Sequence, residues 1–156
     1  MHFPWAELLV AACAAVSATT PGTTQQIGEI GIQGIVTSSG PAVVVVGPYG
    51  ALRTSGRTRL SVSVGGGASD GDFAWRAEAL GHFLLSPDRR RGWGAYVAGG
   101  LAAVGGPVDR GYIVLTLGVE GRPGGPSGWV AEVGIGGGVR IGLGYRWRRF
   151  PRTWPK

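Results

Sequence analysis

Alternation of apolar and polar residues is the feature that most restricts how this sequence can fold. From Ile27 onward no segment keeps a helical period, and a period of two residues recurs instead, interrupted by clusters of Gly, Pro, Asp and Ser. Successive side chains of a β-strand point to opposite faces, so this pattern predicts strands. We expect eight strands, at residues 27–38, 42–54, 57–66, 72–85, 92–104, 111–121, 128–136 and 138–149.

The length and spacing of these segments are typical of a membrane-spanning barrel. Each strand with its turn takes roughly fifteen residues, and a tilted strand of about ten residues is long enough to cross a bilayer. Bacterial single-chain barrels have an even number of strands, which eight satisfies. The sequence therefore predicts an all-β fold, an eight-stranded antiparallel up-and-down transmembrane β-barrel over residues 27–150.

Glycine is unusually frequent, at 31 of 156 residues, although 44% of the chain is hydrophobic. The absence of a Gly-x-y period excludes a collagen-like chain, and the hydrophobic content opposes disorder. Glycine-rich apolar sequence instead fits tightly curved strands and short turns. Pro48 departs from this pattern, because a proline interrupts a closed ladder unless it marks a bulge.

The aromatic residues indicate which face of the strands meets lipid. In residues 72–85 one face carries aromatic rings near both ends and small apolar groups between them. Membrane strands place such rings at the two interfaces, whereas a soluble core strand has its bulk in the middle. With both termini in the periplasm, most of the rings fall at the periplasmic interface. The predicted girdle residues are Phe73, Trp75, Phe83, Trp93, Trp129, Tyr145 and Trp147.

The opposite faces of the strands gather the charged side chains. An arginine at mid-depth in lipid costs on the order of 2–4 kcal/mol. Inside a barrel, arginines and carboxylates can pair with bidentate geometry, and the interior of an eight-stranded barrel is just wide enough for side chains to fill. We therefore expect a plugged lumen rather than an open pore. Its predicted charge network comprises Glu29, Arg57, Arg59, Arg76, Glu78, His82, Glu120, Glu132, Arg140 and Arg146.

The last predicted strand carries a motif that resembles the C-terminal insertion signal of bacterial outer-membrane barrels. In residues 140–147 (RIGLGYRW), Arg140, Gly142, Tyr145 and Trp147 occupy the polar, glycine and two aromatic positions. Over residues 27–150 the chain resembles the small eight-stranded outer-membrane proteins of Gram-negative bacteria. That resemblance implies an outer-membrane location, outer-membrane lipid as surroundings, and recognition of the signal by the barrel-assembly machinery. Such proteins often end on the final aromatic residue, whereas this chain continues through residues 151–156 as a tail.

The N-terminus has the features of an export signal. A short apolar run at residues 8–16 precedes small residues at 16–18, so we interpret residues 1–18 as a signal peptide and 19–26 as a polar lead-in. Two alternatives are an uncleaved structural segment and lipidation of Cys13, since residues 10–13 loosely resemble a lipobox. Cys13 is the single cysteine, which excludes an internal disulfide.

Few residues suggest catalysis or cofactor binding. His82 lies four residues after Glu78 on one strand face and near Ser86, an arrangement that could supply a general base. We favour a histidine within the polar lumen network. One histidine without cysteine partners cannot supply the ligands of zinc, so we expect no metal and no cofactor. The glycine runs at 65–67 and 136–138 lack the lysine and helix of a phosphate loop and are predicted turns.

Two basic clusters remain, at residues 89–91 and 146–154, the second mixed with aromatic residues. Such mixing can bind nucleic acid, but an export signal and the lack of an RNA-binding motif argue against that partner. In the expected topology both clusters lie on the periplasmic side against anionic phospholipid headgroups.

Three functional hypotheses follow. The first is a non-enzymatic outer-membrane barrel with a structural or interaction role and no identified protein partner. The second is a soluble secreted lipocalin-like barrel that binds a small apolar ligand, which requires apolar side chains inside and polar ones outside. The third is a lipid A-modifying barrel enzyme that uses His82. The distribution of charge between the faces favours the first.

Overall fold

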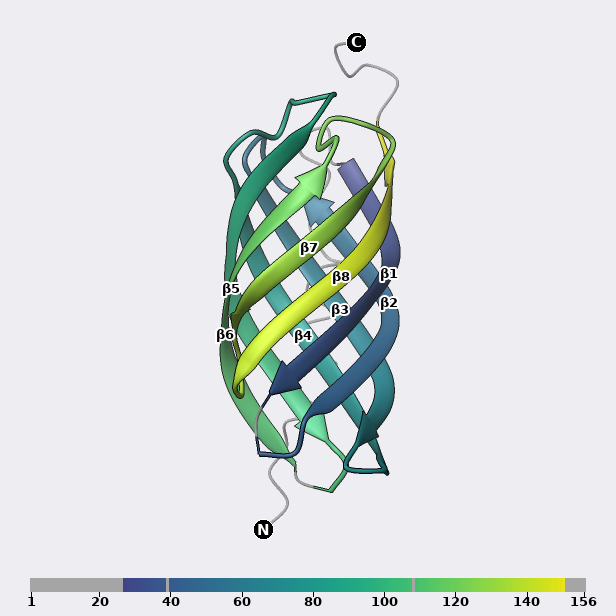
Figure 1. The fold of residues 1–156 in the computed structure, drawn as a ribbon. Coiled ribbons are helices and arrows are strands. Elements are labelled where there is room, and N and C mark those ends of the chain that lie inside the picture. Colours follow the sequence, from purple (N-terminus) through teal and green to yellow (C-terminus); the bar gives the residue numbers. More distant parts are fainter. Residues whose placement is uncertain (1–26, 39, 108, 151–156) are drawn as a thin grey trace.

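The computed structural model describes residues 27–38, 40–107 and 109–150, which form one closed barrel (Figure 1). The predicted signal peptide, lead-in, Cys13 and C-terminal tail lie outside the described residues. Each strand pairs antiparallel with the next, and the last closes the barrel against the first. The eight strands are β1 (Ile27–Ser38), β2 (Val43–Arg53), β3 (Thr58–Ser69), β4 (Asp72–Leu84), β5 (Trp93–Gly105), β6 (Arg110–Gly121), β7 (Ser127–Ile135) and β8 (Val139–Arg149).

The predicted all-β, eight-stranded antiparallel up-and-down fold is confirmed. Within the part of the chain that the structure describes, no helix is long and apolar enough to cross a membrane.

The largest error in the predicted strand boundaries is at the end of β3, which continues to Ser69. The glycines at 65–67, predicted to form a turn, are paired with β4. The turn lies instead at Asp70 and Gly71, both of which have positive φ. The prediction was wrong because glycine serves a different purpose here. A Cβ on Gly67 would overlap the backbone of Val44, so glycine permits the close approach of β2.

Pro48 interrupts the β2–β3 ladder without forming a bulge. The pairs Val46–Gly66 and Tyr49–Ser63 flank the gap, with two residues on each strand between them. The register is therefore the same on both sides, and no residue is inserted. Pro48 is exposed on the outside of the barrel. The proline lacks an N–H donor, and the closed barrel accommodates it because the strands pair in the same register on both sides of the gap.

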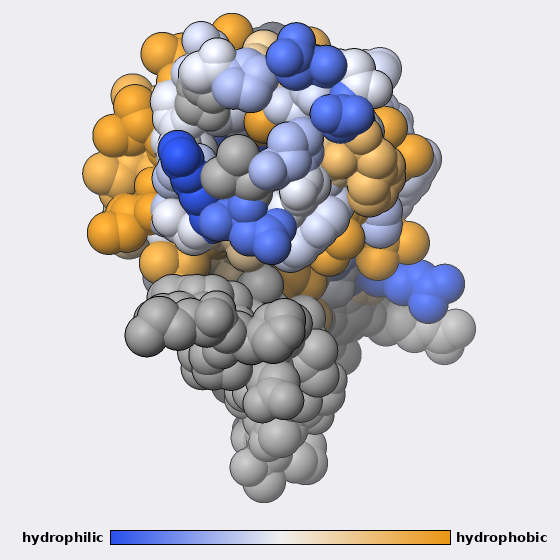
Figure 2. Space-filling model, turned by 90° about the horizontal axis from the view of Figure 1, so that it is seen from below, coloured by the Kyte–Doolittle hydropathy of each residue, from blue (hydrophilic) through white to orange (hydrophobic). Residues whose placement is uncertain are grey.

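The barrel is apolar outside and charged inside. On β8, Ile141 and Leu143 are 51% and 62% exposed, whereas the alternating residues Arg140 and Arg146 are buried. The alternation follows from the pleat of the strand. Figure 2, which views the barrel from below, shows hydrophobic residues on the flanks and hydrophilic residues on the end that faces the viewer.

The two ends of the barrel differ in their connections. The end where β1 begins and β8 ends, here called the terminal end, carries loops at residues 54–57, 85–92 and 122–126. It is uppermost in Figure 1. The opposite or far end carries the connections at 39–42, 70–71, 106–109 and 136–138. The longest connection, 85–92, therefore lies at the terminal end, where it can reach across the barrel mouth.

Candidate functional site

The lumen of the described barrel holds ten buried ionic side chains, each no more than 5% exposed. Every one stands on the inward face of its strand. Burial of unpaired charges is costly, so such side chains need ionic partners and hydrogen bonds. They are the arginines Arg53, Arg59, Arg76, Arg140, Arg146 and Arg148 and the glutamates Glu29, Glu78, Glu120 and Glu132.

Five of these residues form a cluster toward the terminal end. Arg53 Nε donates to Glu29 Oε1 at 2.8 Å. Arg59 Nη1 bridges the two glutamates, at 3.2 Å from Glu29 Oε2 and 2.9 Å from Glu120 Oε2. Arg148 Nη2 donates to Glu120 Oε2 at 2.8 Å. Each carboxylate thus contacts more than one guanidinium, which compensates its burial.

A second cluster lies toward the far end. Arg140 makes a bidentate contact with Glu78, with distances of 2.9 Å from Nε to Oε1 and 2.7 Å from Nη2 to Oε2. Its remaining nitrogen, Nη1, donates to Glu132 Oε2 at 2.8 Å. Arg76 Nε donates to Glu78 Oε1 at 2.6 Å. Planar fork geometry and charge combine in this contact, which is the combination that makes arginine–carboxylate pairs strong.

Arg146 connects the two clusters. Its Nη2 donates to Glu132 Oε1 at 3.2 Å, and its Nη1 lies 3.8 Å from Glu120 Oε2. The guanidinium carbon also lies 4.1 Å from the centre of the Tyr49 ring, a cation–π contact. The lumen is therefore one continuous network from end to end.

Neutral side chains complete the network around Glu132. Tyr96 donates its hydroxyl hydrogen to Glu132, and Gln33 Nε2 donates to the same carboxylate at 2.9 Å. Two inward-facing glycines provide the space. A Cβ on Gly118 would overlap the Tyr96 ring, and a Cβ on Gly142 would lie 3.2 Å from Glu132 Oε2. An added Cβ at Gly118 would force the Tyr96 ring to move, whereas at Gly142 the neighbouring side chains would need to shift by a few tenths of an ångström.

His82 is held as a neutral ring in this network. Its Nδ1 lies 3.2 Å from Arg59 Nη2, and its Nε2 lies 2.7 Å from Ser61 Oγ. A guanidinium only donates, so Nδ1 accepts and the Nε2 hydrogen is directed at the serine. This is the opposite of the polarity that would activate a serine nucleophile. Among the described residues, no group of three or more His, Cys, Asp and Glu side chains could hold a metal ion.

The mouth at the terminal end is covered by two loops. Pro123 of loop 122–126 is fully buried, and Arg53 Nη2 donates to its carbonyl at 2.8 Å. Arg148 Nη1 reaches the carbonyl of Gly125 at 3.4 Å. The two loops are joined by a hydrogen bond from Arg122 N to Gly92 O of 2.8 Å. Lumen arginines thus hold the covering loops in place.

A lumen arginine makes a similar contact with a connection at the far end. Arg76 Nη2 donates to the carbonyl of Gly136 at 3.0 Å, and its Nη1 donates to Thr37 Oγ1 at 3.3 Å. One guanidinium therefore joins Glu78 to the β7–β8 turn.

Sequence reasoning placed most of the lumen charges, with one error and two omissions. Arg57 was predicted inside because it alternates with Arg59, but β3 begins at Thr58 and Arg57 lies exposed in loop 54–57. Arg53 and Arg148 were missed. Arg148 was left out of the predicted network although it shares a face of β8 with Arg140 and Arg146. Arg53 could not be predicted, because the other inward residues of β2 include no charge that would mark the face.

The seven predicted girdle residues all lie on the outer surface. Six of them are exposed, from 38% for Trp75 to 70% for Phe73, and Tyr145 is half-buried. Tyr145 packs between Trp129 and Trp147, with ring centroids 4.9 and 5.1 Å away. Of the predicted insertion signal, Arg140 and Gly142 face the lumen and Tyr145 and Trp147 face outward. Recognition of that signal by the assembly machinery stays a prediction.

A comparison with solved structures shows that this chain is similar in fold to a known β-barrel domain. The chain resembles the crystal structure of the N-terminal β-barrel domain of OprF from Pseudomonas aeruginosa, with a TM-score of 0.61 and 14% sequence identity. The match covers 78% of this chain and 97% of that domain. No protein-family model and no curated protein matches the sequence. The fold thus resembles that of an outer-membrane barrel.

Proposed function

We propose that this chain is an integral outer-membrane protein, a non-enzymatic barrel with a sealed lumen that serves a structural or interaction role. The observation that carries the proposal is the inverted distribution of its side chains. Large apolar residues cover the outside while the ionic network fills the inside. This arrangement suits a barrel whose solvent is lipid.

The outer surface supports contact with lipid. Ile30, Ile113 and Leu117 are 68%, 73% and 61% exposed, and similar residues occur on every strand. Soluble monomers rarely expose contiguous apolar patches larger than a few hundred Å². The cluster of Trp129, Tyr145 and Trp147 lies near the terminal end, where amphipathic rings suit a membrane interface.

The interior does not favour a lipocalin-like carrier. A small apolar ligand needs a cavity lined mainly by apolar side chains. Here the middle of the lumen is occupied by Glu132, Arg140, Arg146 and Tyr96, which contact one another. Removal of that network to admit a ligand would leave buried charges unpaired.

A lipid A-modifying activity is also disfavoured. The hydroxyl that contacts His82 belongs to Ser61, and both residues are buried inside the barrel, 3% and 6% exposed. A lipid substrate on the outside cannot reach them. The partner of His82 Nδ1 is the cation of Arg59, whereas a general base needs a carboxylate or carbonyl there.

The short connections at the far end help to distinguish a structural role of the barrel from that of a receptor or adhesin. With both termini in the periplasm, the far end faces outward, and its longest connections are residues 39–42 and 106–109. Receptors and adhesins use long loops on that side. A structural role within the membrane, or contacts through the barrel wall, fits this architecture better.

Fractionation with heat-modifiability on SDS gels tests the proposal. We expect the expressed protein in the outer-membrane fraction, with a mobility shift that depends on boiling. Resistance to extraction by urea distinguishes integral from peripheral association. Recovery in the soluble periplasm without a shift would overturn the proposal.

Conductance in planar bilayers tests the sealed lumen separately. We expect no nanosiemens channel from the wild-type protein, because Arg53 and Arg148 hold the loops over the terminal mouth. The double variant Arg53→Ala, Arg148→Ala should show increased ion leak. A wild-type channel of nanosiemens size would contradict the sealed interior.

A further inference from the structure

The exposed arginines are concentrated at one end of the barrel. Among the described residues, the terminal end carries six exposed arginines and one exposed carboxylate, Asp88. The far end has the reverse balance, with Asp70, Asp72 and Asp109 against Arg110. We call the six residues the arginine rim: Arg57, Arg89, Arg90, Arg91, Arg122 and Arg149.

Most rim guanidinium groups have no carboxylate partner. Within the described chain, Arg57, Arg91, Arg122 and Arg149 form no ion pair. Arg89 donates through Nη1 to the carbonyl of Trp93 at 2.9 Å, which leaves its other donors free to bind. The lumen arginines, by contrast, all contact glutamates. Unneutralised charge at one end indicates a surface that meets anions.

The rim adjoins the interfacial aromatic residues. Arg91 precedes Trp93 by two positions, and Arg149 follows Trp147 by two. Trp93 and Trp147 are 56% and 50% exposed on the outer face. In a membrane such rings lie at headgroup depth, so the neighbouring guanidinium groups would lie among lipid phosphates.

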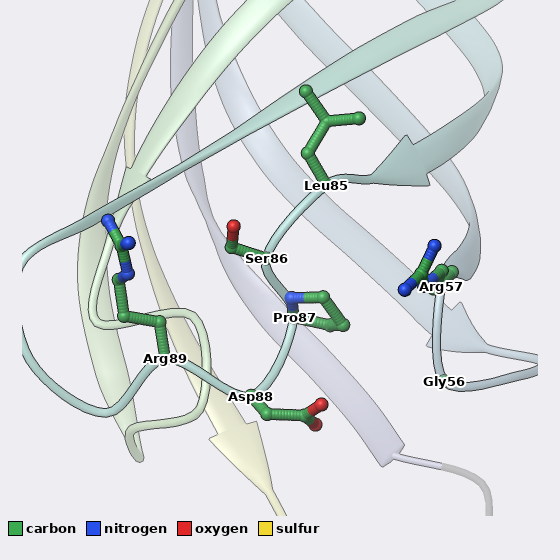
Figure 3. A pocket seen from close by; sticks show the side chains of 7 residues that line it. All are labelled: Gly56, Arg57, Leu85, Ser86, Pro87, Asp88 and Arg89. Carbon is green, nitrogen blue, oxygen red and sulfur yellow. The ribbon is translucent and has the colours of Figure 1, made fainter.

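A pocket within the rim is lined by side chains whose chemistry suits a lipid headgroup. It lies between loops 54–57 and 85–92 and has a volume of about 360 Å³. Figure 3 shows Arg57 and Arg89 on opposite sides of the segment that carries Ser86 and Asp88. Leu85, 53% exposed, forms its apolar border. Guanidinium groups match phosphate geometry, a serine hydroxyl can donate to a phosphate oxygen, and the leucine suits the start of an acyl chain.

We propose that the arginine rim binds the phosphate groups of anionic phospholipids, and that the pocket between loops 54–57 and 85–92, which Arg57 and Arg89 help to line, holds one such headgroup. The inference rests on the proposed membrane insertion, because only then does the rim meet a lipid surface. Asp88 also lines the pocket, and its carboxylate repels an anion. The affinity of the pocket for a phosphate therefore depends on attraction by two guanidinium groups and repulsion by one carboxylate.

Spin-labelled lipids measure this preference directly. The full chain is folded into phosphatidylcholine vesicles that contain a trace of spin-labelled phosphatidylglycerol or, in parallel, spin-labelled phosphatidylcholine. We expect the wild type to associate more strongly with phosphatidylglycerol, and added salt to weaken that preference. Arg57→Gln and Arg89→Gln should each lower it by up to about five-fold, the equivalent of about 1 kcal/mol per arginine.

Two matched variants sharpen the result. Asp88→Asn removes the opposing carboxylate and should increase the preference for phosphatidylglycerol. Arg110→Gln removes an exposed arginine at the far end and should leave it unchanged. A decrease on Asp88→Asn would show that the pocket recognises an ammonium headgroup, which overturns the proposal. An equal loss in Arg110→Gln would reduce the effect to net charge and would overturn it as well.

The source of the phosphate and the membrane insertion are checked on the same samples. Excess inorganic phosphate at constant ionic strength should not displace the spin-labelled lipid, and displacement would assign the pocket to free phosphate instead. A heat-modifiable band from the vesicles establishes insertion. Equal association of both lipids with an inserted barrel refutes the rim proposal alone, whereas absence of the band refutes the proposed function as well.

Discussion

The lumen and the arginine rim contain the same side chain in the same number, six arginines each, in opposite circumstances. In the lumen every guanidinium contacts a glutamate, and the positions are fixed by strand alternation. On the rim four guanidinium groups have no described ionic partner, and most of the six lie in loops. The comparison teaches that the environment, and not the residue type, determines what an arginine contributes. A lumen arginine supports the fold, whereas a rim arginine without an ionic partner, such as Arg57 or Arg149, is available to bind an anion.

Removal of Arg140 should give the largest effect. Arg140→Leu leaves Glu78 and Glu132 without their best partner inside the barrel. Loss of one partner from a buried ion pair costs about 3–5 kcal/mol. Urea titration of the folded barrel in vesicles, followed by tryptophan fluorescence, measures the free energy of unfolding.

A second substitution distinguishes the loss of the ionic attraction from the cost of a buried carboxylate that has no partner. Arg140→Leu combined with Glu78→Gln removes a charge from each side and should recover part of the stability. Arg110→Leu, at an exposed far-end position, serves as the control. If Arg140→Leu unfolds at the same urea concentration as this control, the lumen network does not stabilise the barrel.

The next largest effect should come from the outer face of the same strand. Leu143 is 62% exposed near the middle of β8, between lumen-facing glycines. Leu143→Arg places a charge at mid-depth in the bilayer and should cost about 2–4 kcal/mol by the same urea titration. Leu143→Ala controls for lost side-chain volume. An arginine tolerated without cost would mean that this surface meets water, as in a soluble carrier.

Much of this architecture could be predicted from the sequence because side chains alternate between the two faces of each strand. The period of two assigned the strands, their faces and most of the lumen charges, because burial follows the pleat. The predictions from this period were wrong at a strand end and where two strands approach each other closely. Arg57 has the right parity but lies beyond the strand end, and the glycines at 65–67 resemble a turn although they relieve crowding between strands.

The partners within the lumen could not be predicted at all. Glu132 accepts from Gln33, Tyr96, Arg140 and Arg146, which stand on three other strands. Parity shows that these side chains point inward but gives no height along the barrel axis. That height depends on the register around the closed sheet, which alternation alone leaves open.

Glycines that make room for the network should show an intermediate effect. Gly118→Ala would place a Cβ against the Tyr96 ring and move it from Glu132. Overpacking of this kind costs about 1–3 kcal/mol. Gly111→Ala on the same strand is the matched control, because its Cβ would meet only the carbonyl of Ala102 at 3.9 Å. Equal stability of the two variants, measured by urea titration, would show that the ring has room to move.

The smallest effect should be at Arg149, which shares β8 with Arg140 but is exposed on the rim. Exposed charges away from packed contacts change the free energy of unfolding by within about 0.5 kcal/mol, so Arg149→Gln should unfold like the wild type in phosphatidylcholine vesicles. Vesicles that contain phosphatidylglycerol provide the contrast, since there the wild type should gain stability that the variant partly lacks. A large loss in neutral lipid would show that Arg149 belongs to the structural set, and the division between lumen and rim would then fail at this strand. Equal behaviour in both lipids would leave that division intact but remove Arg149 from the lipid-binding surface.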